Sequence, residues 1–176
     1  MQNHYYVYTD ASFNQKHNLG VSGFYIFHNS REHNAGLTPL SVIRTVQFQE
    51  TSNIRAELRG ALSALEAVEA QVKTKMSAAQ PDWAITLYTD CQTISYLLKR
   101  REKLESCKYV SHRKKIVLPN ADLYKAFFLI YDRLNPKIVW LKGHSPSQNQ
   151  TIIQKNFRLI DQAIRKELRK ATANSV

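Results

Sequence analysis

The chain has 176 residues, 43% of them hydrophobic, and we expect one domain with an apolar core over residues 1–176. It carries 25 lysines and arginines against 14 aspartates and glutamates, a net charge of +11, which favours a polyanionic partner. An anionic membrane is the alternative, but no apolar run approaches the length of a membrane span and no leader-like segment opens the chain, so we expect no membrane association.

The first predicted strand, residues 5–9, is an unbroken run of tyrosine, valine and threonine that stops at Asp10. Such a run is typical of a central strand that is covered on both faces. Asp10 would then lie at the carboxyl end of the strand, where open α/β sheets bind ligands. The alternative is that Asp10 caps the polar turn that follows, residues 13–19.

Two more strands are predicted at residues 20–27 and 42–48. The second of these alternates between apolar and polar residues for most of its length. The polar segment 28–39 between them is expected to hold a turn and little else. Because the connections are short, the three strands predict an antiparallel meander.

The clearest predicted helix begins after three N-cap candidates, Thr51, Ser52 and Asn53. Its apolar residues recur at helical spacing: Ile54, Leu58, Ala61, Leu62, Leu65, Val68 and Val72. Glu57 lies at the edge of this stripe, so we expect its carboxylate to point toward the sheet. The alternative is an acid in the first turn that the helix dipole favours.

A fourth strand at residues 83–89 ends at Asp90 and repeats the pattern of a buried strand followed by Thr-Asp. Because a helix separates it from the first strand, the two strands should be parallel and joined by a right-handed crossover. Asp10 and Asp90 would then lie side by side. Like charges this close need a counter-charge, and a divalent cation would supply it.

A short helix is predicted from Gln92 to about Lys99, and a strongly basic stretch follows at residues 99–115. Two glutamates, Glu102 and Glu105, oppose eight cations there: Lys99, Arg100, Arg101, Lys103, Lys108, Arg113, Lys114 and Lys115. This concentration favours a phosphate-binding protrusion. The alternative is a solvated basic face.

Residues 119–135 predict a further helix that Pro136 ends, with a core face of Leu123, Phe127, Ile130 and Leu134. A fifth strand at residues 137–142 and a polar loop at 143–150 come next. The last helix has an apolar stripe of Ile153, Phe157, Ile160, Ile164 and Leu168. Asp161 stands at the edge of that stripe, and its alternative is an exposed acid that pairs with Arg158 or Arg165.

Four short motifs occur in order on these elements: Asp10-Ala11-Ser12, Thr51–Leu58, Tyr88–Gln92 and Trp140–His144. Together they resemble type-1 ribonuclease H, and the resemblance covers about Tyr5 to Arg169. It implies a ribonuclease H-like α/β fold: a five-stranded mixed sheet, made of the three-strand antiparallel meander and two parallel strands, with helices on both faces.

The resemblance also implies the residues of the site. The metal-binding carboxylates would be Asp10, Glu57, Asp90 and Asp161. His144 would be the mobile-loop histidine that assists proton transfer and product release. Substrate contacts would come from Ser52, Asn53 and Gln92, and from a basic protrusion at about residues 99–118 through Lys99, Arg100, Arg113, Lys114 and Lys115.

The chain departs from the family pattern in three places. The loop after Asp10 lacks the usual proline- and glycine-rich turn, and Ile54 replaces an expected second asparagine. The segment from His144 to Asp161 is longer than usual, and Phe157 stands where an acid is expected. Because the loop after Asp10 lacks the usual turn, no substrate contact is expected between Asn14 and Asn18.

The function that the resemblance implies is endonucleolytic hydrolysis of the RNA strand of RNA–DNA hybrids by a two-metal-ion mechanism. Four carboxylates without paired cysteine or histidine suit two Mg²⁺ ions, with Mn²⁺ as a substitute. One alternative is a hybrid- or dsRNA-binding module with weak or lost catalysis. Another is a related nuclease that acts on DNA, such as a resolvase or exonuclease.

The expected partner is an RNA–DNA hybrid, and we expect a monomer. Cys91 and Cys107 are too few for a disulfide framework and too poorly spaced for a zinc site, so they predict reduced thiols in a cytoplasmic protein. A freestanding protein is expected from the length, and a domain cut from a reverse transcriptase is the alternative.

Overall fold

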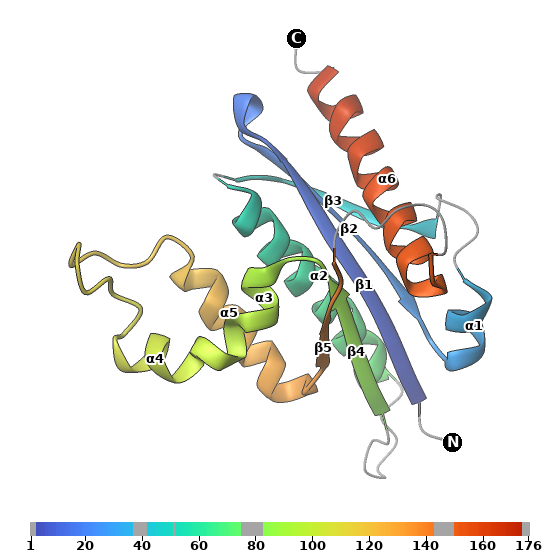
Figure 1. The fold of residues 1–176 in the computed structure, drawn as a ribbon, viewed down its shortest axis with the longest axis horizontal. Coiled ribbons are helices and arrows are strands. Elements are labelled where there is room, and N and C mark those ends of the chain that lie inside the picture. Colours follow the sequence, from blue (N-terminus) through green and yellow to red (C-terminus); the bar gives the residue numbers. More distant parts are fainter. Residues whose placement is uncertain (1–2, 37–41, 51, 75–82, 143–149, 174–176) are drawn as a thin grey trace.

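The computed structural model describes residues 3–36, 42–50, 52–74, 83–142 and 150–173, and Figure 1 shows its fold. Within these ranges, no helix combines the length and the apolar character that crossing a membrane would require. Both cysteines are free.

One five-stranded sheet organises the chain, in the order β3-β2-β1-β4-β5. The strands are β1 (Asn3–Asn14), β2 (Leu19–Phe27), β3 (Arg44–Gln49), β4 (Trp83–Thr89) and β5 (Lys137–Trp140). β2 is antiparallel to β1 and β3, whereas β4 is parallel to β1 and β5. The predicted meander and the predicted parallel pair are both confirmed.

β1 is longer than the sequence predicts, and Asp10 lies within it rather than at its end. The strand continues past Asp10, which pairs with Gly23 of β2, until the hairpin turns at η1 (Gln15–His17). Its pairing with β4, however, ends at Tyr8 opposite Tyr88. Asp10 therefore still emerges at the carboxyl edge of the parallel strands, because β4 stops there while the antiparallel partner continues.

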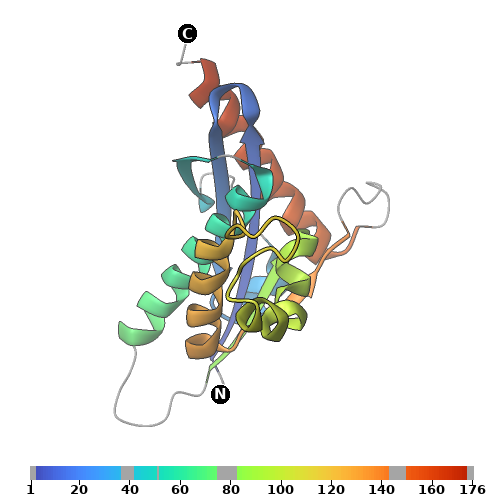
Figure 2. The same ribbon diagram turned by 90° about the vertical axis from the view of Figure 1, so that its left-hand side faces the viewer.

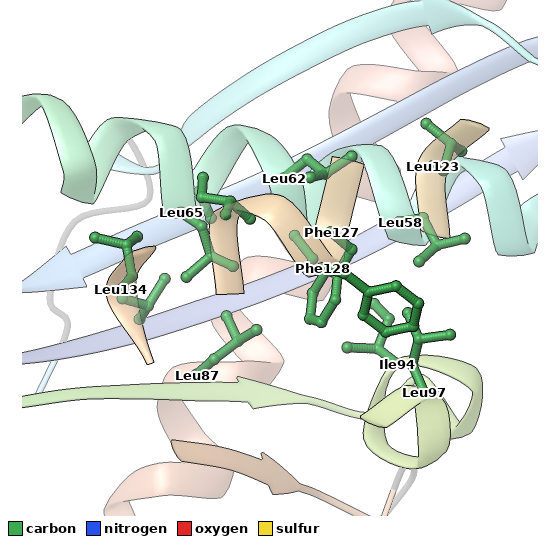
Figure 3. Close-up of a cluster of buried hydrophobic side chains, with 14 of the residues drawn as sticks. Leu58, Leu62, Leu65, Leu87, Ile94, Leu97, Leu123, Phe127, Phe128 and Leu134 are labelled. Carbon is green, nitrogen blue, oxygen red and sulfur yellow. The ribbon is translucent and has the colours of Figure 1, made fainter. Parts of the chain in front are cut away.

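Two helices cover one face of the sheet. α2 (Asn53–Thr74) packs on β1 and β2, and α5 (Ala121–Leu134) packs against α2. Figure 3 shows the core that they share, in which Leu58, Leu65 and Phe127 are completely buried. The predicted stripes of both helices are buried apart from Ile54, which is 41% exposed in the first turn of α2.

The opposite face is covered by α6 (Ile152–Ala173), as the view in Figure 2 shows. Ile160 and Ile164 are completely buried there and belong to one cluster with Tyr8 and Tyr88. The predicted stripe of the last helix thus faces the sheet, and helices lie on both faces as expected.

Two glycines let these helices approach the sheet closely. A Cβ atom on Gly60 of α2 would lie 2.7 Å from Cβ of Ser22, and one on Gly23 of β2 would lie 2.7 Å from Cγ1 of Ile164. Both distances are shorter than van der Waals contact. Gly60 follows Glu57 by about one turn, so the same contact that seats α2 also holds Glu57 close to the sheet.

The segment after β2 forms a helix that the sequence analysis did not expect. α1 (Ser30–Ala35) has Asn29 as its N-cap, whose side chain accepts a hydrogen bond from the Glu32 amide at 2.8 Å. Glu32 in turn accepts from the amide of His28 at 3.0 Å and from the side chain of Asn29 at 2.8 Å, which fixes the start of the helix. His33 fastens the helix to the sheet, with its Nε2 2.7 Å from the Tyr8 hydroxyl. Residues 37–39 of the predicted turn lie outside the described residues.

The short helix predicted over residues 92–99 ends earlier, and a second helix was missed. α3 (Gln92–Leu97) is followed by η3 (Leu98–Arg100) and by α4 (Arg101–Ser106), inside the basic stretch. Arg101 explains the ordered turn, because it pairs with Glu105 of its own helix and with Asp132 of α5. The sequence analysis counted Arg101 among the cations of a phosphate-binding protrusion, whereas this arginine anchors α4 to α5.

We expect Gly60→Ala to lower the free energy of unfolding by about 1–3 kcal/mol, because the new methyl group would overlap Ser22 in a packed interface. Helix propensity alone predicts the opposite, a gain of about 1 kcal/mol for alanine. Urea denaturation measures the difference. Ser22→Gly removes the Cβ atom that the new methyl group would overlap. Gly60→Ala should therefore lower the free energy of unfolding by a smaller amount when Ser22→Gly is also present. A Gly60→Ala protein more stable than its parent would contradict the close approach.

Candidate active site

Three of the four predicted metal-binding carboxylates meet at the carboxyl edge of β1 and β4. One oxygen from each of Asp10, Glu57 and Asp90 lies within 4.8 Å of the others. Asp10 comes from β1, Glu57 from the first turns of α2, and Asp90 directly follows β4. Asp10 and Glu57 are buried, and Asp90 is partly exposed.

Hydrogen bonds from Trp140 of β5 and from the next residue, Leu141, hold the end of β4 in place. The indole nitrogen of Trp140 donates a hydrogen bond to the carbonyl oxygen of Asp90 at 2.9 Å, and the Leu141 amide donates to Thr89 at 2.8 Å. The Thr89 hydroxyl accepts from the Cys91 amide at 3.1 Å. Trp140 therefore fixes Asp90 from a neighbouring strand, a role that the sequence analysis did not assign.

The start of α2 places Glu57. The Ser52 hydroxyl accepts from the Arg55 amide at 3.4 Å, so Ser52 acts as the N-cap, while Thr51 lies outside the described residues. The Asn53 side chain donates to Oε1 of Glu57 at 3.4 Å. Oε2 of Glu57 is buried and has no hydrogen-bond partner among the described residues.

Arg55 ties the same helix end to α5. Its guanidinium contacts Glu50 at 2.6 Å, the carbonyl oxygen of Pro119 at 2.7 Å and both oxygens of Asp122 at 2.9 Å. Arg59 also pairs with Glu50, which is only 4% exposed. These contacts brace the first turn of α2, and they connect the site to the segment that follows the basic protrusion.

Burial and mutual repulsion weaken the acidity of the carboxyl groups. Burial, together with the charges of Asp90 and Asp161, raises the pKa of Asp10 to about 8, although the Ala11 amide and Arg165 act in the opposite direction. Burial and the charges of Asp10 and Asp90 likewise raise the pKa of Glu57 well above its ordinary value. Positive charge at the site would therefore relieve the repulsion between these carboxylates.

A divalent cation would supply this positive charge. The donors are all carboxylate oxygens, which hard cations such as Mg²⁺ prefer, and no paired cysteine or histidine among the described residues accompanies them. The unpartnered buried oxygen of Glu57 offers a ligand position that protein groups leave unused. The three residues therefore suit a magnesium or manganese site.

Asp161 lies on the wall of the same cavity but outside the close cluster. The cavity has a volume of about 360 Å³ and is lined by the three clustered acids, by Asn53, and by the α6 residues Gln154, Phe157, Arg158, Asp161 and Arg165. Oδ1 of Asp161 pairs with Nε of Arg165 at 2.6 Å. The ion pair offered as the alternative is thus present, and Asp161 also faces the cavity.

The predicted substrate residues surround the cavity unevenly. Asn53 lines it, whereas Ser52 caps α2 and Gln92 is exposed at the start of α3. His144 lies outside the described residues. Arg158, Arg165 and Lys142 also line the cavity, although the sequence analysis gave the two arginines a role only as ion-pair partners and Lys142 none.

The basic protrusion is an ordered excursion beyond α3, seen at the left of Figure 1. Tyr109 is buried at its base, and a bridge between Val110 and Val117 closes a loop. Two hydrogen bonds of 2.8 Å, Ser111 to Ile116 and Leu118 to Tyr109, complete the closure. The exposed side chains at the tip include Arg113, Lys114 and Lys115, while Lys99 and Arg100 are exposed in η3.

The fold and the cavity define an α/β domain with a buried carboxylate cluster, a class of site suited to hard divalent cations. The family model for RNase H matches residues 2–167, and the chain belongs to the RNase H family. Membership supports the prediction of a nuclease, that is, a hydrolase. No curated protein matches the chain.

Solved structures agree on the fold. The solution structure of the RNase H domain of prototype foamy virus, PFV, has a TM-score of 0.63 at 16% identity, covering 94% of this chain and 93% of that chain. LC9-RNase H1, described as a type 1 RNase H with the type 2 active-site motif, has the same score and identity, covering 92% and 70%. The foamy viral protease-reverse transcriptase in complex with dsDNA reaches 0.58 at 14%, covering 94% and 95%.

The raised pKa of Asp10 predicts a pH-dependent stability of the metal-free protein. A carboxyl group that binds its proton more tightly in the folded state stabilises folding most below its unfolded pKa, about 4, and this contribution is lost as pH rises toward about 8. We expect the free energy of unfolding to fall over this interval, by at most about 1.4 kcal/mol per pH unit for each proton.

Urea denaturation in EDTA at several pH values measures this slope. Asp10→Asn should flatten it and raise the stability near pH 8, because the buried charge is removed. Glu66→Gln, which changes an exposed carboxylate on the same domain, serves as the control and should leave the slope unchanged. Equal slopes for Asp10→Asn and the parent would contradict the proposed electrostatics.

Proposed function

We propose that the chain is a divalent-metal-dependent endoribonuclease that hydrolyses the RNA strand of RNA–DNA hybrids and acts as a monomer. The observation that carries the proposal is the cluster of Asp10, Glu57 and Asp90 in a chain of the RNase H family. The net charge of +11 supports a polyanionic substrate.

Asp10, Glu57, Asp90 and Asp161 would hold two Mg²⁺ ions, with Mn²⁺ as a substitute. Such a pair of ions, when bound, activates a water nucleophile and stabilises the leaving oxygen of a phosphodiester. The protein holds Asp10 and Asp90 on adjacent strands and Glu57 on a helix that is braced by Arg55, so little reorganisation is required of the carboxylates. His144 would assist proton transfer and product release, as the resemblance implies.

Selectivity for a hybrid would come from the side of the cavity that α2 forms. Asn53 lies at the cavity and at the start of this helix, where an amide can reach a minor groove and its 2′-hydroxyl groups. Ser52 lies beside it, at a helix N-terminus that favours a phosphate. Gln92, exposed at the start of α3, would contact the hybrid from the next element.

The basic protrusion would bind the phosphates of the DNA strand. Arg113, Lys114 and Lys115 at its tip are exposed, and Lys99 and Arg100 extend the charge toward α3. Contacts of this kind fix the position of a duplex without reading its sequence. Arg101 is excluded from this role because Asp132 and Glu105 hold it.

The deciding experiment incubates the protein with end-labelled RNA–DNA hybrid, dsRNA, dsDNA and single-stranded RNA, with and without Mg²⁺. Magnesium-dependent cleavage of the RNA strand in the hybrid alone is the expected result. Asp90→Asn should abolish cleavage and leave the circular dichroism spectrum unchanged. Hybrid binding without cleavage would favour a binding module, and cleavage of DNA would favour a related DNA nuclease.

Asp161→Ala is expected to lower magnesium-supported turnover by about 100-fold or more, as when an oriented metal-site group is lost. Mn²⁺, which binds oxygen sites more tightly, should restore part of the activity. Glu167→Ala is the matched control, because Glu167 lies on α6 but hydrogen-bonds Gln47 and pairs with Lys170 away from the cavity. Similar turnover in both variants would remove Asp161 from the ligand set.

Replacing Arg113, Lys114 and Lys115 together with alanine should raise KM several-fold with little change in kcat. The slope of log binding constant against log salt concentration should fall by about 0.9 for each lost phosphate contact. Steady-state cleavage kinetics measure KM and kcat, and fluorescence anisotropy with a labelled hybrid at several salt concentrations measures the salt slope. An unchanged salt slope would identify the tip as a solvated basic face.

A further inference from the structure

Three arginines occupy one flank of α6, the flank that faces the acidic cavity. With about 100° of rotation per residue, Arg158, Arg165 and Arg169 fall within about 40° of one another, on the exposed side of Asp161 and away from the buried Ile160 and Ile164. Arg158 and Arg165 line the cavity itself. The Nε of Arg169 donates to the carbonyl oxygen of Arg165 at 3.1 Å, which directs it along the same flank.

The three arginines are exposed, and most of their charge is not neutralised. Arg165 pairs with Asp161, but Arg158 and Arg169 have no carboxylate within ion-pair distance in the part of the chain that the structure describes. The other acid of the helix, Glu167, is on the opposite flank, where it contacts Gln47 and Lys170. A positive strip therefore leads away from the cavity.

The two flanks differ in the kind of cation they carry. The flank toward the cavity has arginine at all three basic positions, whereas the outer flank carries Lys155, Lys166 and Lys170. Arginine binds phosphate through two parallel N–H groups, while a surface lysine is a hydrated point charge. The flank that carries the arginines is therefore better suited to binding phosphates than the flank that carries the lysines.

The arginine strip lies across the sheet from the basic protrusion. Figure 1 shows α6 on one side of β1, and α4 with its following loop on the other. A strand whose phosphate lies at the acidic cluster would pass Arg158 and Arg165, because both line the cavity, whereas the protrusion lies on the other side of β1. The strip extends about 16 Å from Arg158 to Arg169, close to the axial rise of five nucleotides of one strand.

We propose that Arg158, Arg165 and Arg169 form a second phosphate-binding surface, here called the track. The track binds the strand that is cut, and it does so on one side of the scissile phosphate. This inference rests on the proposed nuclease function, and it adds a contact surface that is separate from the basic protrusion. The track holds the cut strand beside the cavity, while the protrusion holds its complement.

The test compares Arg169→Ala with Lys166→Ala, two exposed single-charge changes that lie three residues apart on α6. Asp90→Asn is present in every protein, so that a fluorescein-labelled RNA–DNA hybrid is bound in Mg²⁺ without being cut. Arg169→Ala should raise Kd by about 3- to 10-fold and lower the salt slope by about 0.9, whereas Lys166→Ala should change neither. Equal effects of the two changes, or no effect of either, would overturn the track.

A second arm locates the track along the substrate. The position at which the protein without Asp90→Asn cuts the hybrid is first determined. Hybrids are then shortened either on one side of this position or on the other. Shortening on one side should abolish the difference in Kd between Arg169→Ala and its parent, and shortening on the other side should preserve it. A difference that survives both truncations would refute a contact with the cut strand beside the site.

The outcomes separate this inference from the proposed function. If the protein without Asp90→Asn cuts dsDNA or dsRNA in place of the hybrid, the proposed function fails, and the contrast between Arg169→Ala and Lys166→Ala on that duplex still decides the track. If the hybrid is cut as proposed but the two variants bind it equally, the function stands and the track is refuted.

Discussion

The crowding of buried carboxylates at the edge of the sheet is the constraint on which the rest of the structure depends. Each ionised oxygen loses hydration and also repels its neighbours, so the cluster opposes folding and must be held together by rigid surrounding structure. The rigidity comes from adjacent parallel strands for Asp10 and Asp90, and from a helix seated tightly at Gly60 for Glu57. The stability lost at this site is offset by the cores on both faces of the sheet.

Positive charge is arranged around this acidic centre. The protrusion carries its cations on one side of β1, and α6 carries its arginines on the other, where Arg158 and Arg165 line the cavity beside the carboxylates. Such surroundings would attract a polyanion, and the carboxylate cluster itself would attract cations. This division explains how a chain of net charge +11 contains a site that needs further positive charge.

The fold persists at 14–16% identity to the solved structures because few of its contacts need a particular residue. An apolar stripe on α2 and α6, and strands with buried faces, can be met by many side chains. Positions such as Gly60, where any Cβ would strike Ser22, are exceptions that the packing geometry imposes. Gly60 lies where α2 must bring Glu57 close to the sheet.

The sequence by itself determined the strands, the long helices and the closeness of Asp10 to Asp90, because periodicity and the crossover rule are local or topological. Tertiary structure decided the rest. α1 depends on His33 reaching Tyr8, and α4 on Arg101 reaching Asp132, contacts between residues far apart in the chain. The length of β1 past Asp10, and the presence of the Arg158 flank at the cavity, likewise follow only once β2 and α6 are in place.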